Sequence, residues 1–226
     1  YHEGLRRILE AYLKNLSQPT QKAVWVHAFY GCGKSHLVRI LQFLWSDVQF
    51  PDGSTARGLV TVPQDISDAL QELTQASKSR GGLWSAADAM SSSGGNDARA
   101  AILGVVLKAA GLPERINQAQ FDIWVREAGW YEAICAGLAE DKRDYRTEVN
   151  HLFVSPWLAK QLMSACPGFA SSEQDALTKI QAQFPDVRTV STDLMISMMR
   201  RVLDLKSERK GKLPCTLLVL DELQQY

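Results

Sequence analysis

Residues 22–35, KAVWVHAFYGCGKS, decide the fold that this sequence predicts. Residues 22–27 are a short apolar run with β-branched and aromatic side chains, the composition of a buried strand in a parallel sheet. A glycine-bearing turn follows, and residues 36–45 (HLVRILQFLW) have the apolar spacing of a helix. A strand, a turn ending in Gly-Lys-Ser and a helix form the context that a phosphate-binding loop requires.

The residue types of this turn suit a nucleoside triphosphate. Backbone N–H groups at a helix N-terminus complement phosphate oxygens, and Gly31 and Gly33 let the backbone approach them closely. Lys34 would place its charge on the β and γ phosphates, and the Ser35 hydroxyl would complete a Mg²⁺ shell. Ala28 stands where the usual G-x-x-x-x-G-K-[ST] motif has its first glycine. The candidate nucleotide-binding residues are Ala28, Phe29, Tyr30, Gly31, Cys32, Gly33, Lys34, Ser35 and His36.

A second apolar run, residues 215–220 (CTLLVL), ends directly in Asp221 and Glu222. Ligands of parallel sheets bind at the carboxyl ends of the strands, so both sequence motifs are expected at one edge of one sheet. Asp221 would hold Mg²⁺ through water, and Glu222 would polarise the water that attacks the γ phosphate. The candidate catalytic residues are therefore Glu222 and Lys34, and the candidate metal ligands are Ser35 and Asp221.

Composition excludes several classes of protein. The 226 residues carry 25 basic and 25 acidic side chains, so the net charge gives no indication of a nucleic-acid or membrane partner. No apolar run approaches the length of a membrane span, and no guanine-reading Asn-Lys-x-Asp element occurs. The scattered cysteines show neither zinc nor disulfide spacing, which favours a cytoplasmic location; they are Cys32, Cys135, Cys166 and Cys215.

The remaining pattern predicts an α/β fold of the P-loop NTPase (AAA+/ASCE-like) type, with a parallel sheet that is incomplete in this chain. Residues 83–87 (LWSAA) are expected to form a second parallel strand. Helices are expected over 2–16, 66–79, 97–110, 118–128, 130–138, 145–152, 155–165, 172–184 and 192–209, with Asp65, Asn96 and Ser155 as caps. The predicted division is an ATPase core over 1–111 and 211–226, with an inserted helical subdomain over 112–210.

These features together resemble the large P-loop ATPase of the bacteriophage-exclusion (BREX) defence systems, the BrxC/PglY family. The resemblance is carried by residues 24–41, which include WVHAFYGCGKSHLVRIL, and by residues 217–226, LLVLDELQQY. It implies an ATPase that uses Mg²⁺, forms a homo-oligomer and acts with other defence-system proteins against phage DNA. It also implies that further sheet and sensor residues follow Tyr226, so the chain is expected to be a piece of a longer polypeptide.

Two other functions stay open at this point. An AAA+ loader that remodels DNA would be favoured by a DNA-reading module after Tyr226. A nucleotide-dependent assembly scaffold with little turnover is favoured by Ala28 in place of glycine. The basic side chains over residues 200–212 fit the end of a helix better than a nucleic-acid contact.

Overall fold

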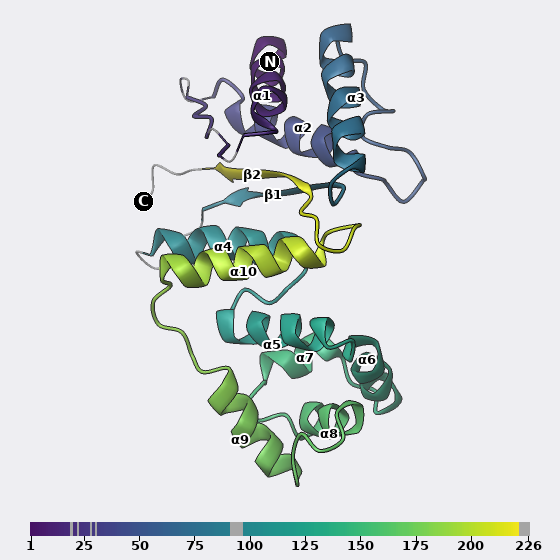
Figure 1. Cartoon of the computed structure of the whole chain (residues 1–226), viewed down its shortest axis with the longest axis vertical. Helices are drawn as coiled ribbons and strands as arrows, with labels where there is room; N and C mark the ends of the chain where they lie inside the picture. The colour runs from purple at the N-terminus through teal and green to yellow at the C-terminus, as the bar shows by residue number, and fades with distance from the viewer. Residues whose placement is uncertain (19, 22, 28, 30, 91–96, 222–226) are drawn as a thin grey trace. The chain divides into compact units, whose positions relative to one another are not determined.

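The structure is a computed structural model that describes residues 1–18, 20–21, 23–27, 29, 31–90 and 97–221. It is a mixed α/β protein with a small two-stranded parallel sheet and many helices (Figure 1). The chain forms two compact units, Tyr1–Met90 with Lys206–Tyr226, and Ser91–Leu205. The assignment of functional domains to 1–111, 112–210 and 211–226 stays a prediction.

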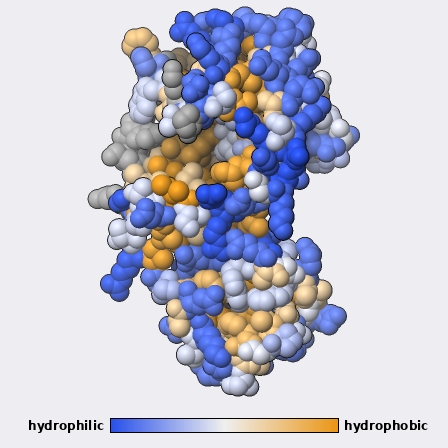
Figure 2. Space-filling model, viewed as in Figure 1, coloured by the Kyte–Doolittle hydropathy of each residue, from blue (hydrophilic) through white to orange (hydrophobic). Residues whose placement is uncertain are grey.

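The first unit packs helices α1 (His2–Asn15), α2 (Lys34–Ser46) and α3 (Gln64–Lys78) with the two strands. Each helix has an apolar stripe at a 3.6-residue period, so one face is buried and the other is solvated. Polar side chains accordingly cover the outer surface of α1 and α3 (Figure 2). The core is formed by Leu5, Leu9, Leu37, Leu41, Leu44, Trp45, Ile66, Ala69, Leu70, Leu73 and Cys215.

Strands β1 (Leu83–Ala89) and β2 (Cys215–Asp221) pair in parallel, in a register that joins Leu83 to Cys215 and Ala89 to Asp221. The prediction of two parallel strands at these positions is confirmed. Their carboxyl ends lie at the same edge, because parallel strands in this register end together. The buried Trp45 indole at the end of α2 donates a hydrogen bond of 3.0 Å to the Cys215 carbonyl, which ties that helix to the start of β2.

The prediction of a strand over residues 22–27 is wrong for the residues in this range that the structure describes. Residues 23–27 enter no ladder, and the Trp25 side chain is 70% exposed. Strand composition favours an extended chain, but a strand also needs a neighbour that satisfies its backbone N–H and C=O groups. Here β1 and β2 pair with each other, and the apolar run from Ala23 to His27 has neither strand as a partner.

The regular elements among the described residues of the second unit are all helices, as the helical period predicts. Its helices are α4 (Ala98–Ala109), α5 (Ile116–Glu127), α6 (Tyr131–Glu140), α7 (Tyr145–Asn150), α8 (Pro156–Ala165), α9 (Glu173–Gln183) and α10 (Thr192–Leu205). Helices α4 and α10 lie side by side (Figure 1). Phe121, Leu138, Leu158 and Phe184 belong to a core shared by α5–α9, which explains why Trp124 and Trp130 pack inward.

Helix starts confirm one predicted cap and correct two. Ser155 caps α8 by accepting from the Leu158 N–H, with proline in the first turn. Helix α4 is capped by Asp97, which accepts from Arg99 N–H and from Val190 N–H, whereas the predicted cap Asn96 lies outside the described residues. Helix α3 begins at Gln64 without a side-chain cap, so Asp65 sits in its first turn.

Helix α10 ends at Leu205, earlier than expected, and basic side chains on it and after it make protein contacts. Arg201 forms an ion pair of 2.7 Å with Glu127, and Arg209 donates to the Lys78 carbonyl at 2.7 Å. These contacts support the structural interpretation of the basic stretch. No helix among the described residues has the length and apolar character needed to cross a membrane.

Arg57 is a half-buried cation that joins the C-terminal end of α2 to the middle of α3 in the first unit. Its guanidinium donates to carbonyls near the C-terminus of α2 and to the middle of α3, and its backbone N–H donates to Asp47. The acceptors of the guanidinium are the Leu44, Trp45 and Leu70 carbonyls and the Thr74 hydroxyl, at 2.6–3.1 Å. Burial lowers the pKa of Arg57 from its ordinary value.

We expect Arg57→Met to lower the free energy of unfolding by about 2–4 kcal/mol, because several buried carbonyls lose a charged donor. Arg7→Met is the matched control, since Arg7 is exposed and its ion pair with Glu3 is on the surface. Urea unfolding of both variants measures the difference. Equal midpoints would show that Arg57 adds nothing to the stability of this unit.

Candidate functional site

The glycine turn has the backbone geometry that only glycine adopts easily. Gly33 precedes α2 with φ 85° and ψ 24°, and Gly31 has φ 79°. A residue with a Cβ would be strained at both positions. The turn therefore leads directly into the N-terminus of α2, where the first backbone N–H groups have no acceptors within the helix.

The side chains of the predicted site are mostly open to solvent. Phe29 is 92% exposed, and Cys32, Ser35 and His36 are also exposed. The Lys34 ammonium donates a hydrogen bond of 3.0 Å to the Phe29 carbonyl, so it lies against its own loop. Three predicted residues, Ala28, Tyr30 and Glu222, lie outside the described residues.

Contacts between α2 and the sheet give the direction of the helix. Near its C-terminus, the Ser46 hydroxyl is 2.7 Å from the Ser85 hydroxyl in the first half of β1. Earlier in α2, Arg39 donates at 3.3 Å to the Ala87 carbonyl, near the end of β1. Helix α2 therefore runs antiparallel to the strands. Because Lys34 lies about 7 Å further along the helix axis than Arg39, the N-terminus of α2 is directed to the carboxyl edge of the sheet.

Asp221 lies at that edge and on the face of the sheet that α2 covers. Leu83, Cys215 and Leu217 all pack into the core between the sheet and the helices. Side chains alternate between faces along a strand, so Asp221, six residues after Cys215, has the same orientation as Cys215. The register pairs Asp221 with Ala89, the last residue of β1. The N-terminus of α2, which carries Lys34 and Ser35, and the Asp221 carboxylate are thus directed to the same edge and the same face of the sheet.

The donor set at this edge suits a phosphate with a hard cation. Backbone N–H groups, the Lys34 ammonium and the Ser35 hydroxyl are groups that bind phosphate oxygens. The Ser35 hydroxyl and the Asp221 carboxylate are oxygen ligands of the type that Mg²⁺ takes alongside water and phosphate. No cluster of three or more His, Cys, Asp or Glu occurs among the described residues, so a metal held by protein side chains alone has no candidate there.

Sequence reasoning missed three residues at this edge. Tyr1 contacts the glycine turn through its hydroxyl, and Arg39 reaches the end of β1, where Asp88 lies 3.9 Å from its guanidinium. Asp88 had a sequence signal, because it follows an apolar strand run just as Asp221 does. Tyr1 had none, since nothing local connects it to a turn some thirty residues away.

Comparison with protein-family models gives no match, and comparisons with curated proteins and with solved structures give no significant match. Any function of this chain is therefore inferred from the residues and geometry of this edge.

Proposed function

We propose that this chain is a P-loop ATPase module of the AAA+-like class, which binds ATP with Mg²⁺ and hydrolyses it. The observation that carries the proposal is the convergence of the N-terminus of α2, which begins at Lys34, and the Asp221 end of β2 at one edge and face of the sheet. These two motifs are 187 positions apart in the sequence, from 34 to 221. A nucleotide site needs this convergence, whereas an ordinary glycine turn does not.

The roles of the residues follow from their chemistry. The turn at Gly31 and Gly33 exposes N–H donors to the phosphates, and Lys34 leaves the Phe29 carbonyl to bind the β and γ oxygens. Mg²⁺, when bound, neutralises charge on those oxygens, with Ser35 and Asp221 as its protein contacts. Glu222, the next residue in the chain, accepts a proton from the attacking water.

We further propose, from the sequence resemblance, that the module acts in a bacterial BREX-type anti-phage complex as a homo-oligomer with other defence-system proteins. Residues 24–41 and 217–226 carry this part of the proposal. Co-purification of the full-length protein with its neighbours in a defence operon, and loss of phage protection with Lys34→Ala, would test it. Normal protection by a Lys34→Ala variant would overturn the role of nucleotide in defence.

A nucleotide-dependent scaffold is the second candidate, and Ala28 favours it. Alanine in place of the first loop glycine affects turnover more than binding, because the N–H groups and Lys34 remain. Phosphate release and oligomeric state, measured together on the full-length protein with ATP, separate the candidates. Assembly with ATP in the absence of phosphate release would favour the scaffold over the ATPase.

The Asp221 carboxylate supplies a direct test of the metal site. We expect Asp221→Asn to keep metal-free ATP binding, to lose the Mg²⁺-dependent gain in affinity, and to hydrolyse ATP about 10–100-fold more slowly. Asp204→Asn is the control, because Asp204 is an exposed carboxylate on α10. Calorimetric titration with ATP, with and without Mg²⁺, measures the effect. An unchanged Mg²⁺ dependence would remove Asp221 from the site.

A further inference from the structure

Tyr1 makes a contact with the glycine turn that the proposed function does not use. Its hydroxyl lies 3.3 Å from the Gly33 carbonyl oxygen and 3.5 Å from the Cys32 carbonyl oxygen, so its single O–H is shared between these two acceptors. Its ring meets the His36 ring edge to face, with centroids 5.9 Å apart and planes at 88°. One side chain at the start of α1 therefore contacts both the turn and the first helical turn that follows it.

The contact depends on close backbone approach at two glycines. A Cβ added at Gly33 would lie 1.7 Å from the Tyr1 hydroxyl oxygen, so a larger residue there would displace this hydroxyl as well as strain the backbone at φ 85°. A Cβ added at Gly4 would lie 3.3 Å from the Leu37 side chain, so α1 also approaches the first turn of α2 closely. Both approaches bring the start of α1 against the start of α2.

Peptide geometry gives this contact a consequence for anion binding. In a planar trans peptide, the C=O and N–H groups point in opposite directions. The Cys32 carbonyl shares a peptide with the Gly33 N–H, and the Gly33 carbonyl shares a peptide with the Lys34 N–H. The Gly33 carbonyl also accepts the first backbone hydrogen bond of α2, from the Leu37 N–H at 3.0 Å. The Tyr1 hydroxyl adds a donor on the carbonyl side of both peptides, which favours the orientation in which both N–H groups point to the other side.

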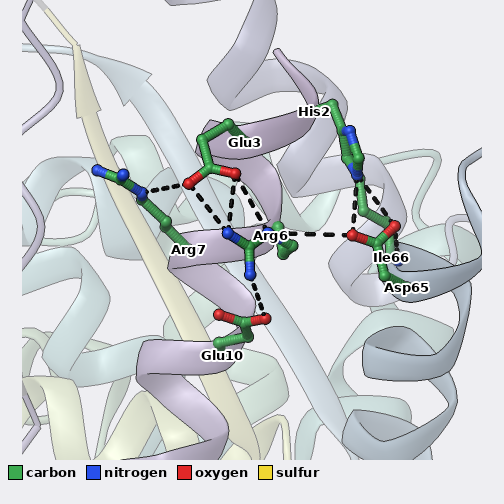
Figure 3. Close-up of polar contacts among 7 residues, drawn as sticks. All are labelled: His2, Glu3, Arg6, Arg7, Glu10, Asp65 and Ile66. Carbon is green, nitrogen blue, oxygen red and sulfur yellow. Dashed lines mark hydrogen bonds and ion pairs between the residues drawn. The ribbon is translucent and has the colours of Figure 1, made fainter.

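Tyr1 is itself held in place by the first turn of α1. The next residue, His2, lies 2.9 and 3.0 Å from the two carboxylate oxygens of Asp65 on α3, and Arg6 lies 3.9 Å from the same carboxylate (Figure 3). The hydrogen bond from His2 lowers the pKa of Asp65 below its ordinary value. The start of α1 is thus fixed to a second helix, α3.

We propose that Tyr1 is a positioning residue for the phosphate loop. Its hydroxyl, together with the Leu37 N–H on the Gly33 carbonyl, orients the two peptides around Gly33, so that the N–H groups of Gly33 and Lys34 are set to receive a phosphate. The identity of the ligand in this inference rests on the proposed function, whereas the ordering of the loop by Tyr1 does not depend on it.

Tyr1→Phe in the full-length protein removes only the donor. We expect it to weaken the binding of Mg·ATP and of Mg·tripolyphosphate equally, by about three- to tenfold, which corresponds to the loss of one hydrogen bond. Backbone order parameters of the Gly33 and Lys34 amides, from ¹⁵N relaxation without ligand, should also fall. Tyr131→Phe on α6 is the control for loss of a tyrosine hydroxyl elsewhere, and equal melting temperatures of the two variants would exclude a general loss of structure.

Three results would overturn the inference or separate it from the proposed function. Unchanged affinities and order parameters in Tyr1→Phe would show that the hydroxyl does not position the loop. A weaker affinity for ATP with an unchanged affinity for tripolyphosphate would show that Tyr1 acts on the base and not on the phosphates, which would overturn the inference. A wild-type protein that binds neither ligand would overturn the proposed function, and the order parameters alone would then decide whether Tyr1 orders the turn.

Discussion

Lys34→Ala is expected to weaken Mg·ATP binding by at least about 100-fold. The lysine is the side-chain cation of the phosphate turn, and each charge-assisted hydrogen bond to phosphate contributes about 1.5–3 kcal/mol. In the structure, its ammonium already reaches back over the turn to the Phe29 carbonyl, at 3.0 Å. A phosphate bound against the N–H groups would take the place of that carbonyl.

The measurement is a calorimetric or fluorescence titration of the full-length protein with Mg·ATP. Lys14→Ala is the matched control, because Lys14 is an exposed lysine near the end of α1 in the same unit. We expect the control to bind as the wild type does. Lys34→Arg should recover only part of the affinity, because a planar guanidinium does not fit a site built for a compact ammonium. Wild-type affinity in Lys34→Ala would mean that the turn is not a phosphate site.

Glu222→Gln is expected to slow hydrolysis by about 100- to 1,000-fold while leaving Mg·ATP affinity near that of the wild type. A carboxylate that accepts a proton from the attacking water contributes on this scale, and the isosteric amide keeps the shape but not the basicity. The prediction follows from the sequence, because Glu222 comes directly after Asp221 at the end of β2. It separates binding from chemistry, which Lys34→Ala does not.

Single-turnover and steady-state phosphate release should be measured on the same preparation as the affinity. Glu72→Gln is the control, since Glu72 is exposed on α3. A Glu222→Gln variant that releases phosphate at the wild-type rate would remove Glu222 from the chemistry. If the wild type itself binds ATP without releasing phosphate, the scaffold candidate gains support and Ala28 becomes the residue to restore to glycine.

Most of the secondary structure could be predicted from local patterns. The apolar runs before Asp88 and Asp221 predicted β1 and β2, because strands buried in parallel sheets are almost continuously apolar. The 3.6-residue period predicted the helices of both units, and most differences are at helix ends, where Asp97 rather than Asn96 caps α4. Helix ends depend on single hydrogen bonds, so they are the least determined by the pattern.

Among the described residues, the apolar run at 23–27 is an element that composition mispredicted. Its side chains suit a strand, but a strand forms only where a neighbouring chain accepts and donates backbone hydrogen bonds. Trp25 is instead exposed in the structure. Local sequence could not reveal this outcome, because strand pairing depends on contacts between segments far apart in the chain, and in the described residues only β1 and β2 pair in this way.

The sequence by itself determined the chemistry of the candidate site. Gly31, Gly33, Lys34 and Ser35 before a helix, and Asp221 after a strand, are recognisable because phosphate and Mg²⁺ demand these groups in these local contexts. Only the tertiary structure decided which edge and face of the sheet these groups share. It also decided that the Tyr1 side chain contacts the glycine turn. The physical reason is that strand register, helix direction and contacts such as Tyr1 to Gly33 depend on packing between residues far apart in the chain, which no local pattern records.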